Sequence, residues 1–262
     1  MRMGAGIAGL AGTLWRLALM AGAGALVVQA LFFCKIGLWV VIDPGTTSFM
    51  RAQQLRLESP EPNVPRAEVP AAQPRRAAAN PPPRPAGQPV IQHAWVPYER
   101  ISRNIKRAVI AAEDSNFTEH DGVDWDALER AWQKNQRRGH VVAGGSTLTQ
   151  QLAKNLFLTP ERSYVRKAQE FAITWMLEFW MDKPRILEVY LNVVEWGVGV
   201  FGIEAAAHHY YGVNAAVLTA PQAARLAAML PNPRYFDRNR NHPQLLRKAG
   251  IVLARMNGAA LP

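Results

Sequence analysis

An uncharged apolar run near the N-terminus limits what the first part of this chain can become. Residues 17–34 read LALMAGAGALVVQALFFC, and after Lys35 the apolar stretch continues as IGLWVVI to Ile42. A helix needs about 20 predominantly apolar residues to cross the hydrocarbon core of a bilayer, and this stretch is long enough. The sequence therefore predicts one transmembrane helix over residues 17–42.

The charges around this run indicate its orientation. Arg2 and Arg16 precede it, which favours a cytoplasmic segment at residues 1–16. Lys35 lies near the far end, where its ammonium group can extend to the interface. A cleaved signal peptide is the alternative, but its apolar core would be shorter and would precede an Ala-x-Ala-like site, which is not obvious here. An uncleaved anchor is favoured.

Proline dominates the segment that follows. Ten of the 19 prolines fall within residues 51–90, among scattered arginine and alanine. Proline cannot continue a helix or donate to a strand ladder, so such a segment cannot build a packed core. The sequence predicts an extended or disordered spacer over residues 43–90. A docking site for proline-binding domains is a less favoured reading.

Residues 91–262 are long enough for one domain with a core of its own. The formal net charge of +10 fits an anionic partner, which includes nucleic acid, anionic lipid or a phosphorylated substrate. The basic residues form no clustered stripe with interleaved aromatics, so nucleic-acid binding is not expected. Cys34 is the only cysteine, which excludes a disulfide within the chain and a cysteine-based metal site.

The pattern after Trp95 is helical. Apolar residues recur at helical spacing, Pro184 stands where the first turn of a helix tolerates proline, and no convincing run of alternating strand residues occurs. We expect a mainly α domain. The predicted helical segments are ISRNIKRAVIAAED (101–114), TLTQQLAKNLFL (147–158), residues 164–181, RILEVYLN (185–192), QAARLAAML (222–230) and QLLRKAGIVLARM (244–256).

A cluster of acids follows the first of these helices. Five acids fall within twelve residues and surround His120; they are Glu113, Asp114, Glu119, Asp121 and Asp124. A carboxylate at the end of an apolar helix can be partly desolvated, which raises its pKa and suits it to proton transfer. A solvated helix end with capping acids is an equally good reading. A metal site is less favoured, because a lone histidine among acids is more often structural.

A second polar group opens the next helix. Gly144 and Gly145 precede Ser146, an N-cap candidate, and Ser146, Gln150 and Lys154 share one helical face at i, i+4 and i+8. A helix N-terminus with free N–H groups and a lysine on the same stripe suits a phosphate. An ordinary polar face is the alternative. The spacing of a P-loop is absent.

A third group is Arg166-Lys167-Ala168-Gln169-Glu170. Arg166 and Glu170 are four residues apart with the base first, the poorer orientation for a helical ion pair. A stabilising pair therefore explains these residues weakly, whereas an arginine fork recognises phosphate oxygens well. Glu170 adds a second carboxylate to Glu113. Together with a membrane tether, these groups suit transfer from a lipid diphosphate better than hydrolysis of a soluble sugar.

Five segments of the chain, in order, resemble the motifs of family 51 glycosyltransferases. They span most of residues 95–240, and no catalytic motif position departs from the family pattern. The segments are EDSNFTEHDGVDW (113–125), GGSTLTQQLAKNLFL (144–158), RKAQE (166–170), KPRILEVYLNVVEWGVGVFGIEAAAHHYYG (183–212) and PQAARLAAMLPNPRYF (221–236).

This resemblance implies a lysozyme-like helical domain with a smaller membrane-proximal lobe, preceded by the anchor. It implies a peptidoglycan glycosyltransferase that joins a glycan chain on undecaprenyl diphosphate to lipid II with inversion. By the resemblance, Glu113 is the general base for the acceptor 4-hydroxyl and Glu170 a second essential acid whose role is less defined. The donor phosphates fall to Lys154 and Arg166, with Lys167 nearby. Other site-lining positions are Asp114, Phe117, His120, Ser146, Thr147, Gln150, Gln151 and Asn155.

The resemblance also sets expectations about surroundings. We expect a single-pass bacterial inner-membrane protein with a periplasmic catalytic domain and no tightly bound cofactor. Mg²⁺ or Mn²⁺ is a candidate divalent cation, and the sequence leaves open whether one is required. Cell-wall synthase or divisome proteins are candidate partners. No serine from Ser48 to Ser163 is followed three residues later by lysine, so no transpeptidase nucleophile is expected and the chain is expected to be monofunctional. A lysozyme-like hydrolase, which also uses two carboxylates, and a non-enzymatic scaffold are the alternatives.

Overall fold

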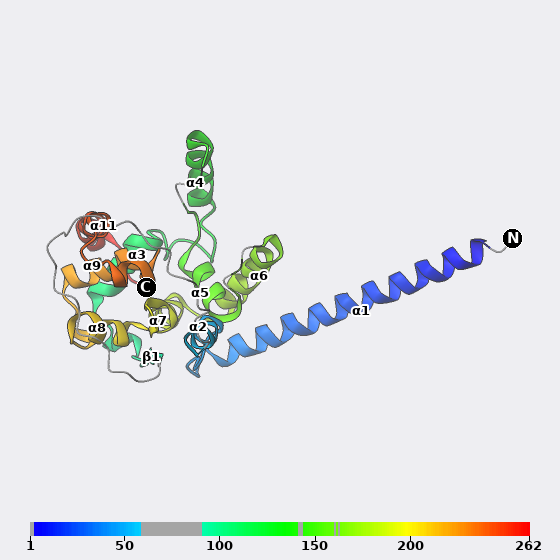
Figure 1. Cartoon of the computed structure of the whole chain (residues 1–262), viewed down its shortest axis with the longest axis horizontal. Helices are drawn as coiled ribbons and strands as arrows, with labels where there is room; N and C mark the ends of the chain where they lie inside the picture. Colours follow the sequence, from blue (N-terminus) through cyan, green and yellow to red (C-terminus); the bar gives the residue numbers. More distant parts are fainter. Residues whose placement is uncertain (1–2, 59–90, 141–143, 160, 162) are drawn as a thin grey trace, which may run out of the picture.

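The computed structural model describes residues 3–58, 91–140, 144–159, 161 and 163–262. Its longest element is helix α1 (Met3–Leu38), which extends far from the rest of the protein (Figure 1). Trp15–Leu38 is long and apolar enough to cross a membrane, and most of its residues are exposed, although Ile36 near its end is buried. The predicted anchor is thus a helix, although it ends at Leu38 and continues as turns to Ile42 rather than as helix.

The sequence prediction of an unstructured linker from residue 43 is wrong for its first part. Residues Ser48–Glu58 form helix α2, with Met50 2% exposed. This helix packs against α5 (Leu148–Phe157), and Ser48 Oγ donates a 3.0 Å hydrogen bond to the Leu156 carbonyl. Because α2 buries side chains of its own, it belongs to the folded domain. The rest of the predicted linker, residues 59–90, lies outside the described part of the chain.

Helices are the main elements of the domain, as the sequence predicts. The six predicted segments are helical; they correspond to α3 (Arg103–Glu113), α5, α6 (Tyr164–Trp180), α7 (Lys183–Val193), α9 (Ala220–Met229) and α11 (Pro243–Arg255). Asp182 caps α7 by accepting from Arg185 N at 2.9 Å, and Pro184 occupies the first turn. The elements that the sequence pattern left unassigned are α4 (Trp125–Arg138), α8 (Ile203–Tyr211) and α10 (Pro233–Arg238).

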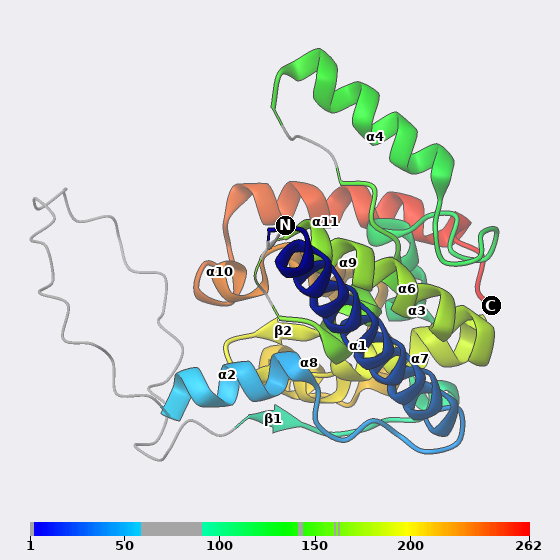
Figure 2. The same cartoon turned by 90° about the vertical axis from the view of Figure 1, so that its right-hand side faces the viewer.

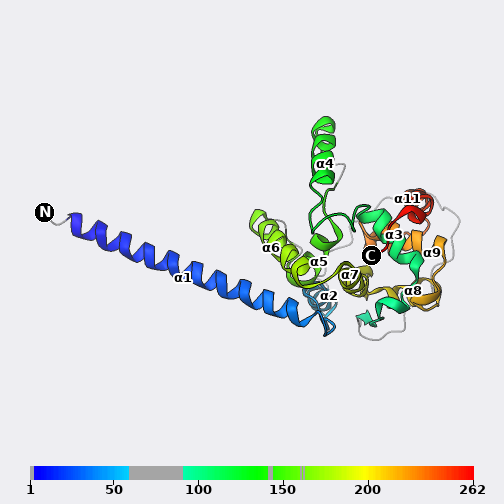
Figure 3. The same cartoon turned by 180° about the vertical axis from the view of Figure 1, so that it is seen from behind.

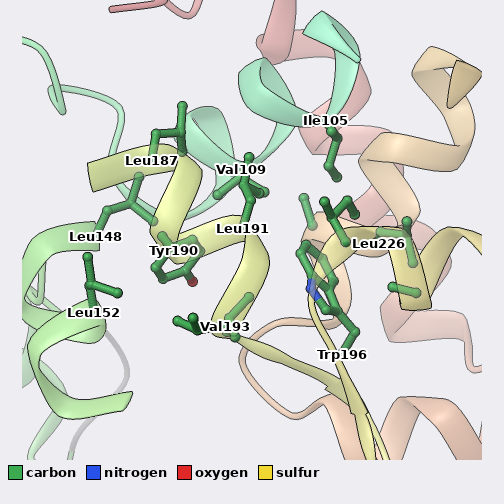
Figure 4. Close-up of a cluster of buried hydrophobic side chains, with 14 of the residues drawn as sticks. Ile105, Val109, Leu148, Leu152, Leu187, Tyr190, Leu191, Val193, Trp196 and Leu226 are labelled. Atoms are coloured by element: carbon green, nitrogen blue, oxygen red, sulfur yellow. The ribbon is translucent and has the colours of Figure 1, made fainter. Parts of the chain in front are cut away.

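Helix α7 is the centre of the core. Figure 4 shows Leu187, Tyr190 and Leu191 of α7 between α5 on one side and the helices that carry Val109 and Leu226 on the other. The labelled α7 side chains are fully buried. Burying apolar surface stabilises the fold by about 25 cal/mol per Å². Because α7 buries apolar side chains against helices on both of its sides, it stabilises the packing of both sides of the domain.

Two groups of helices flank α7. Helices α3, α9 and α11 pack together on the side away from α1, whereas α5, α6 and α2 lie on the side of α1 (Figures 1 and 3). Helix α4 stands off from the second group (Figure 2). The second group is therefore the lobe next to the apolar helix, and the prediction of a helical domain preceded by one N-terminal apolar helix is confirmed.

A small sheet lies beside the larger group. Strands β1 (Gln92–His93), β3 (Val200–Phe201) and β2 (Glu195–Gly197) are ordered β1-β3-β2, with β1 parallel and β2 antiparallel to β3. The turn into α8 requires glycine at position 202. Gly202 has a φ of +79°, and a Cβ added there would lie only 2.6 Å from the Asn192 carbonyl oxygen. Strands of two or three residues are too short to show alternation, which is why the sequence pattern did not reveal them.

The anchor is docked on the domain rather than tethered at a distance. Gln29 of α1 and Gln169 of α6 exchange side-chain hydrogen bonds of 2.7 and 3.0 Å, and the ring of Phe33 lies 5.1 Å from that of Trp180. Arg185 of α7 donates to the Trp39 carbonyl at 2.9 Å, just after the end of α1. These contacts fix the direction of α1 relative to α6 and α7.

Candidate active site

Glu113 ends α3 and is held by side chains from two other helices. Gln151 Nε2 of α5 donates to Glu113 Oε2 at 2.9 Å, and the fully buried Tyr190 of α7 donates its hydroxyl to Gln151 Oε1 at 3.0 Å. Burial raises the pKa of Glu113, whereas the Gln151 hydrogen bond and the positive charges of Lys248 and Lys154 oppose that rise. A desolvated carboxylate of this kind can take a proton from a bound hydroxyl group.

The neighbouring Asp114 has a structural contact of its own. Its Oδ2 accepts from the backbone N–H of Leu148 at 2.9 Å, at the start of α5, and its Oδ1 lies 3.0 Å from His120 Nε2. Asp114 and His120 are both largely buried. They therefore join the turn after α3 to α5 and hold Glu113 against Gln151.

The start of α5 differs from the sequence prediction. Thr147, not Ser146, is the N-cap; it accepts from Gln150 N and forms a capping box with the Gln150 side chain. Asp114 and Thr147 thus accept from the backbone N–H groups of Leu148 and Gln150, two of the donors predicted to be free to bind a phosphate. Gln150 is 2% exposed, so the predicted polar stripe of Ser146, Gln150 and Lys154 does not exist. On α5, Gln151 donates to Glu113, and the charge of Lys154 interacts with both Glu113 and Glu170.

Three further predicted contact residues are buried and support the site from beneath. Phe117 is fully buried, Thr147 donates to the Gly122 carbonyl at 2.6 Å, and Asn155 Nδ2 donates to the Gln151 carbonyl at 2.8 Å. With side chains in the core, these residues hold the backbone of the site in place.

Glu170 is surrounded by the cations of its own motif. Arg166 Nη1 donates to Glu170 Oε2 at 2.8 Å, and Lys167 Nζ donates to Glu170 Oε1. The Arg166–Glu170 ion pair, which the base-first spacing made a weak explanation for these residues, is therefore formed. Arg166 Nε is buried and has no hydrogen-bond partner within the described residues, so this guanidinium retains a donor for an additional anion. Exposed Ser146 lies 3.5 Å from Lys167 Nζ.

Lys154 connects the two carboxylates. Burial lowers its pKa, and its charge interacts with Glu170, Arg166 and Lys167 on one side and with Glu113 on the other. No acceptor in the described part of the chain forms a hydrogen bond with Lys154 Nζ. A partly buried ammonium group without a hydrogen-bonding partner, beside an incompletely paired arginine, is suited to bind an anion such as a phosphate.

Sequence reasoning missed several residues at this site. Tyr190 and Lys183 lie within a segment that carries the family resemblance, but helical spacing alone marks Tyr190 as a core residue. Lys248 lies on α11, 135 positions after Glu113, and its charge reaches that carboxylate only through the fold. Glu178 of α6 accepts from Lys183 Nζ at 2.8 Å. Nothing in the local pattern distinguishes this acid from a surface residue.

The donor set does not suit a metal ion held by the protein alone. Over the described ranges, no group of three or more His, Cys, Asp or Glu residues is arranged to hold one. Glu170 already contacts two cations, His120 contacts Asp114, and Asp124 caps α4 by accepting from Ala127 N at 2.7 Å. The structural reading of the acid cluster around His120 therefore fits these contacts.

Comparisons with known proteins identify the family of the chain. A family model described as Transglycosylase matches residues 86–257. A biosynthetic peptidoglycan transglycosylase of Janthinobacterium sp. (strain Marseille) is 57% identical over 237 residues, covering 90% of this chain and 92% of the relative. Proteins of the same name from Herminiimonas arsenicoxydans and Ralstonia nicotianae are 56% and 52% identical; the matches cover 90% and 92% of this chain and 92% and 94% of the relatives. The chain therefore belongs to the transglycosylase family, among the peptidoglycan transglycosylases.

Proposed function

We propose that this transglycosylase polymerises lipid II into glycan strands, taking the growing strand from an undecaprenyl-diphosphate-linked donor. One observation carries the proposal. Glu113, a carboxylate with a pKa raised by burial, lies near Lys154, and the charge of Lys154 also reaches the cluster around Glu170. A proton acceptor and an anion site in one place match an acceptor hydroxyl and a diphosphate leaving group.

In the proposed reaction Glu113 accepts the proton of the acceptor 4-hydroxyl. The oxygen forms a bond to the anomeric carbon of the donor from the face opposite the diphosphate, and the bond from that carbon to the diphosphate oxygen breaks with inversion. Lys154 and Arg166 balance the charge that develops on the leaving oxygens, as preorganised cations do in other transfer enzymes. Base catalysis of such an attack contributes about 10²–10⁴-fold.

Glu170 is assigned a positioning role in this scheme. Both of its oxygens contact cations of its own helix, so it orients Arg166 and Lys167 toward the donor. A retaining or inverting hydrolase would instead need an acid that protonates a sugar leaving group. A diphosphate leaves as an anion and needs cations, which favours the transferase over the hydrolase.

The lobe next to the apolar helix supports a membrane-bound substrate. The side chains of Val165, Trp175 and Phe179 on α6 are 81%, 55% and 70% exposed, on the helix that packs against α1. Exposed aromatic and aliphatic side chains beside a spanning helix suit the lipid interface. We propose a single-pass inner-membrane enzyme with its catalytic domain in the periplasm and without transpeptidase activity.

None of the proposed steps passes through a metal ion. If Mg²⁺ or Mn²⁺ takes part, the diphosphate oxygens of the substrate would supply most of its ligands, because Mg²⁺ commonly binds through substrate phosphates and one or two carboxylates. Incubation with labelled lipid II, with and without Mg²⁺, followed by gel separation, tests whether the protein polymerises lipid II and whether it uses the cation. A ladder of long strands that a muramidase digests is expected. Release of fragments from finished peptidoglycan without polymer from lipid II would establish a hydrolase instead.

A further inference from the structure

A largely buried ion pair contacts the turn that follows Glu113. Lys183, the first residue of α7, donates from Nζ to Glu178 Oε1 of α6 at 2.8 Å and to the His120 carbonyl at 2.6 Å. The ammonium group also lies 4.8 Å from the ring centroid of the buried Phe117. The Lys183 and Glu178 side chains are 18% and 10% exposed. One lysine thus joins α6, α7 and the turn after α3.

Glu178 extends this contact to α5. Its Oε1 also accepts from Thr149 Oγ1 at 2.6 Å. The turn lies directly on this carboxylate side chain, because a Cβ at Gly122 would lie 3.0 Å from Glu178 Cγ and 2.7 Å from Thr174 Cγ2. The position of the turn relative to α5 and α6 is therefore fixed by close packing and by hydrogen bonds together.

The turn that contains His120 is also connected to Glu113, the candidate base. The His120 carbonyl contacts Lys183, and the His120 ring nitrogen Nε2 lies 3.0 Å from Asp114 Oδ1. Asp114 follows Glu113 in the chain and holds the N–H of Leu148 at the start of α5. Polar contacts therefore run from Lys183 through His120 and Asp114 to the backbone of Glu113.

We propose that Lys183 and Glu178 are positioning residues for catalysis, which hold Glu113 in place through His120 and Asp114 without touching substrate. This inference rests on the proposed role of Glu113 as the base. A buried ion pair contributes little to stability relative to an apolar pair of the same volume, because desolvation offsets the attraction. Its contribution here is geometric, because general-base catalysis depends on the base being within hydrogen-bond reach of the proton it accepts.

The test uses the full-length protein with lipid II and measures kcat and KM separately. We expect Lys183→Met to lower kcat by about 10- to 100-fold, a part of the full contribution of a general base, and to leave KM within about twofold, because the cations of the donor site are untouched. Lys183→Arg keeps a charged donor and should recover most of kcat. Glu178→Gln keeps an acceptor for Lys183 and Thr149 and should lose less than Lys183→Met.

A double-mutant cycle separates positioning from general destabilisation. In a His120→Ala background, Lys183→Met should lower kcat by no more than about threefold further, because residues that act through one another are not additive. Arg234→Met is the matched control: it breaks the Arg234–Glu195 ion pair, whose contacts are 2.7 and 3.0 Å, outside this network. It should leave kcat unchanged even where it lowers the melting temperature.

Wild-type kcat in a folded Lys183→Met protein would overturn the inference, as would an effect confined to KM. Full multiplication of the Lys183→Met and His120→Ala losses would also overturn it. If Lys183→Met does not fold, Lys183→Arg and Glu178→Gln decide: an equal, complete loss in both would contradict a graded positioning role. Failure of the proposed function is recognised separately, because the wild-type protein would then make no polymer from lipid II. Failure of the base assignment is recognised because Glu113→Gln would retain glycan synthesis.

Discussion

Replacing Gln151 by leucine tests how the structure sets the proton affinity of Glu113. The Gln151 amide donates a 2.9 Å hydrogen bond to Glu113 Oε2, an interaction that favours the ionised carboxylate. Hydrogen bonds to charged groups contribute about 1.5–3 kcal/mol, and one pKa unit corresponds to about 1.4 kcal/mol. Loss of the amide removes a contact that stabilises the ionised form, so it should raise the pKa of Glu113 further.

The sign of the activity change follows from the role of the base. Glu113 must be ionised to accept a proton, so activity is lost as the pH falls through its pKa. A higher pKa moves that loss to higher pH. The acid limb of the profile of kcat/KM against pH, which reports the free enzyme, should shift to higher pH in Gln151→Leu. Glycan synthesis from labelled lipid II across a pH series measures this shift.

Two controls make the result specific. Gln151→Leu leaves the buried Tyr190 hydroxyl without its acceptor, which costs about 1–3 kcal/mol of stability. Adding Tyr190→Phe removes the orphaned hydroxyl, so the double variant should regain melting temperature but keep the shifted pH profile. Gln54→Leu removes a glutamine that donates to Glu58 at 2.8 Å on the surface, and it should change neither property. An unshifted acid limb in the folded double variant would refute the reasoning.

Three other outcomes follow from the same geometry. Glu113→Gln should abolish polymerisation while circular dichroism and melting temperature remain those of the wild type; strand synthesis at the normal rate would remove the base assignment. Lys154→Ala and Arg166→Ala should each mainly raise the donor concentration needed for half-maximal rate, by about tenfold if one charge-assisted contact of about 1.4 kcal/mol is lost, and unchanged donor kinetics in both would remove their role at the phosphates. Gly122→Ala should lower the free energy of unfolding by more than about 1 kcal/mol, since Gly122 has a φ of +89° and the new Cβ would meet Thr174 Cγ2 at 2.7 Å; a denaturation midpoint equal to that of the wild type would contradict the close packing of this turn.

The features predicted well from the sequence are those that local patterns specify. Residues 17–34 are helical as predicted, and their length and lack of charge are those of a helix that can cross a bilayer. Helices α3, α5, α6, α7, α9 and α11 follow apolar spacing, with Asp182 and Pro184 marking the start of α7. The ordered family segments by themselves indicate the family and mark Glu113, Lys154, Arg166 and Glu170 as candidate site residues.

The predictions that failed depended on partners distant in sequence. Residues 48–58 carry a mixed polar composition beside many prolines, and only packing on α5 makes them a helix of the domain. The start of α5 offers N–H groups to an anion in isolation, but Asp114, 34 residues earlier, occupies one of them. Local periodicity contains no information about such contacts.

The division between sequence and tertiary structure is clearest at the carboxylates. Residue type and order alone indicated a membrane anchor, a helical domain, two essential acids and nearby cations, because these follow from local spacing and from family motifs. The tertiary structure decided which of those groups reach each other: Gln151 rather than Gln150 contacts Glu113, Phe117 lies in the core, and Lys183 supports the turn behind the base. Burial and hydrogen-bond partners are properties of packed helices, and only the folded chain brings those helices together.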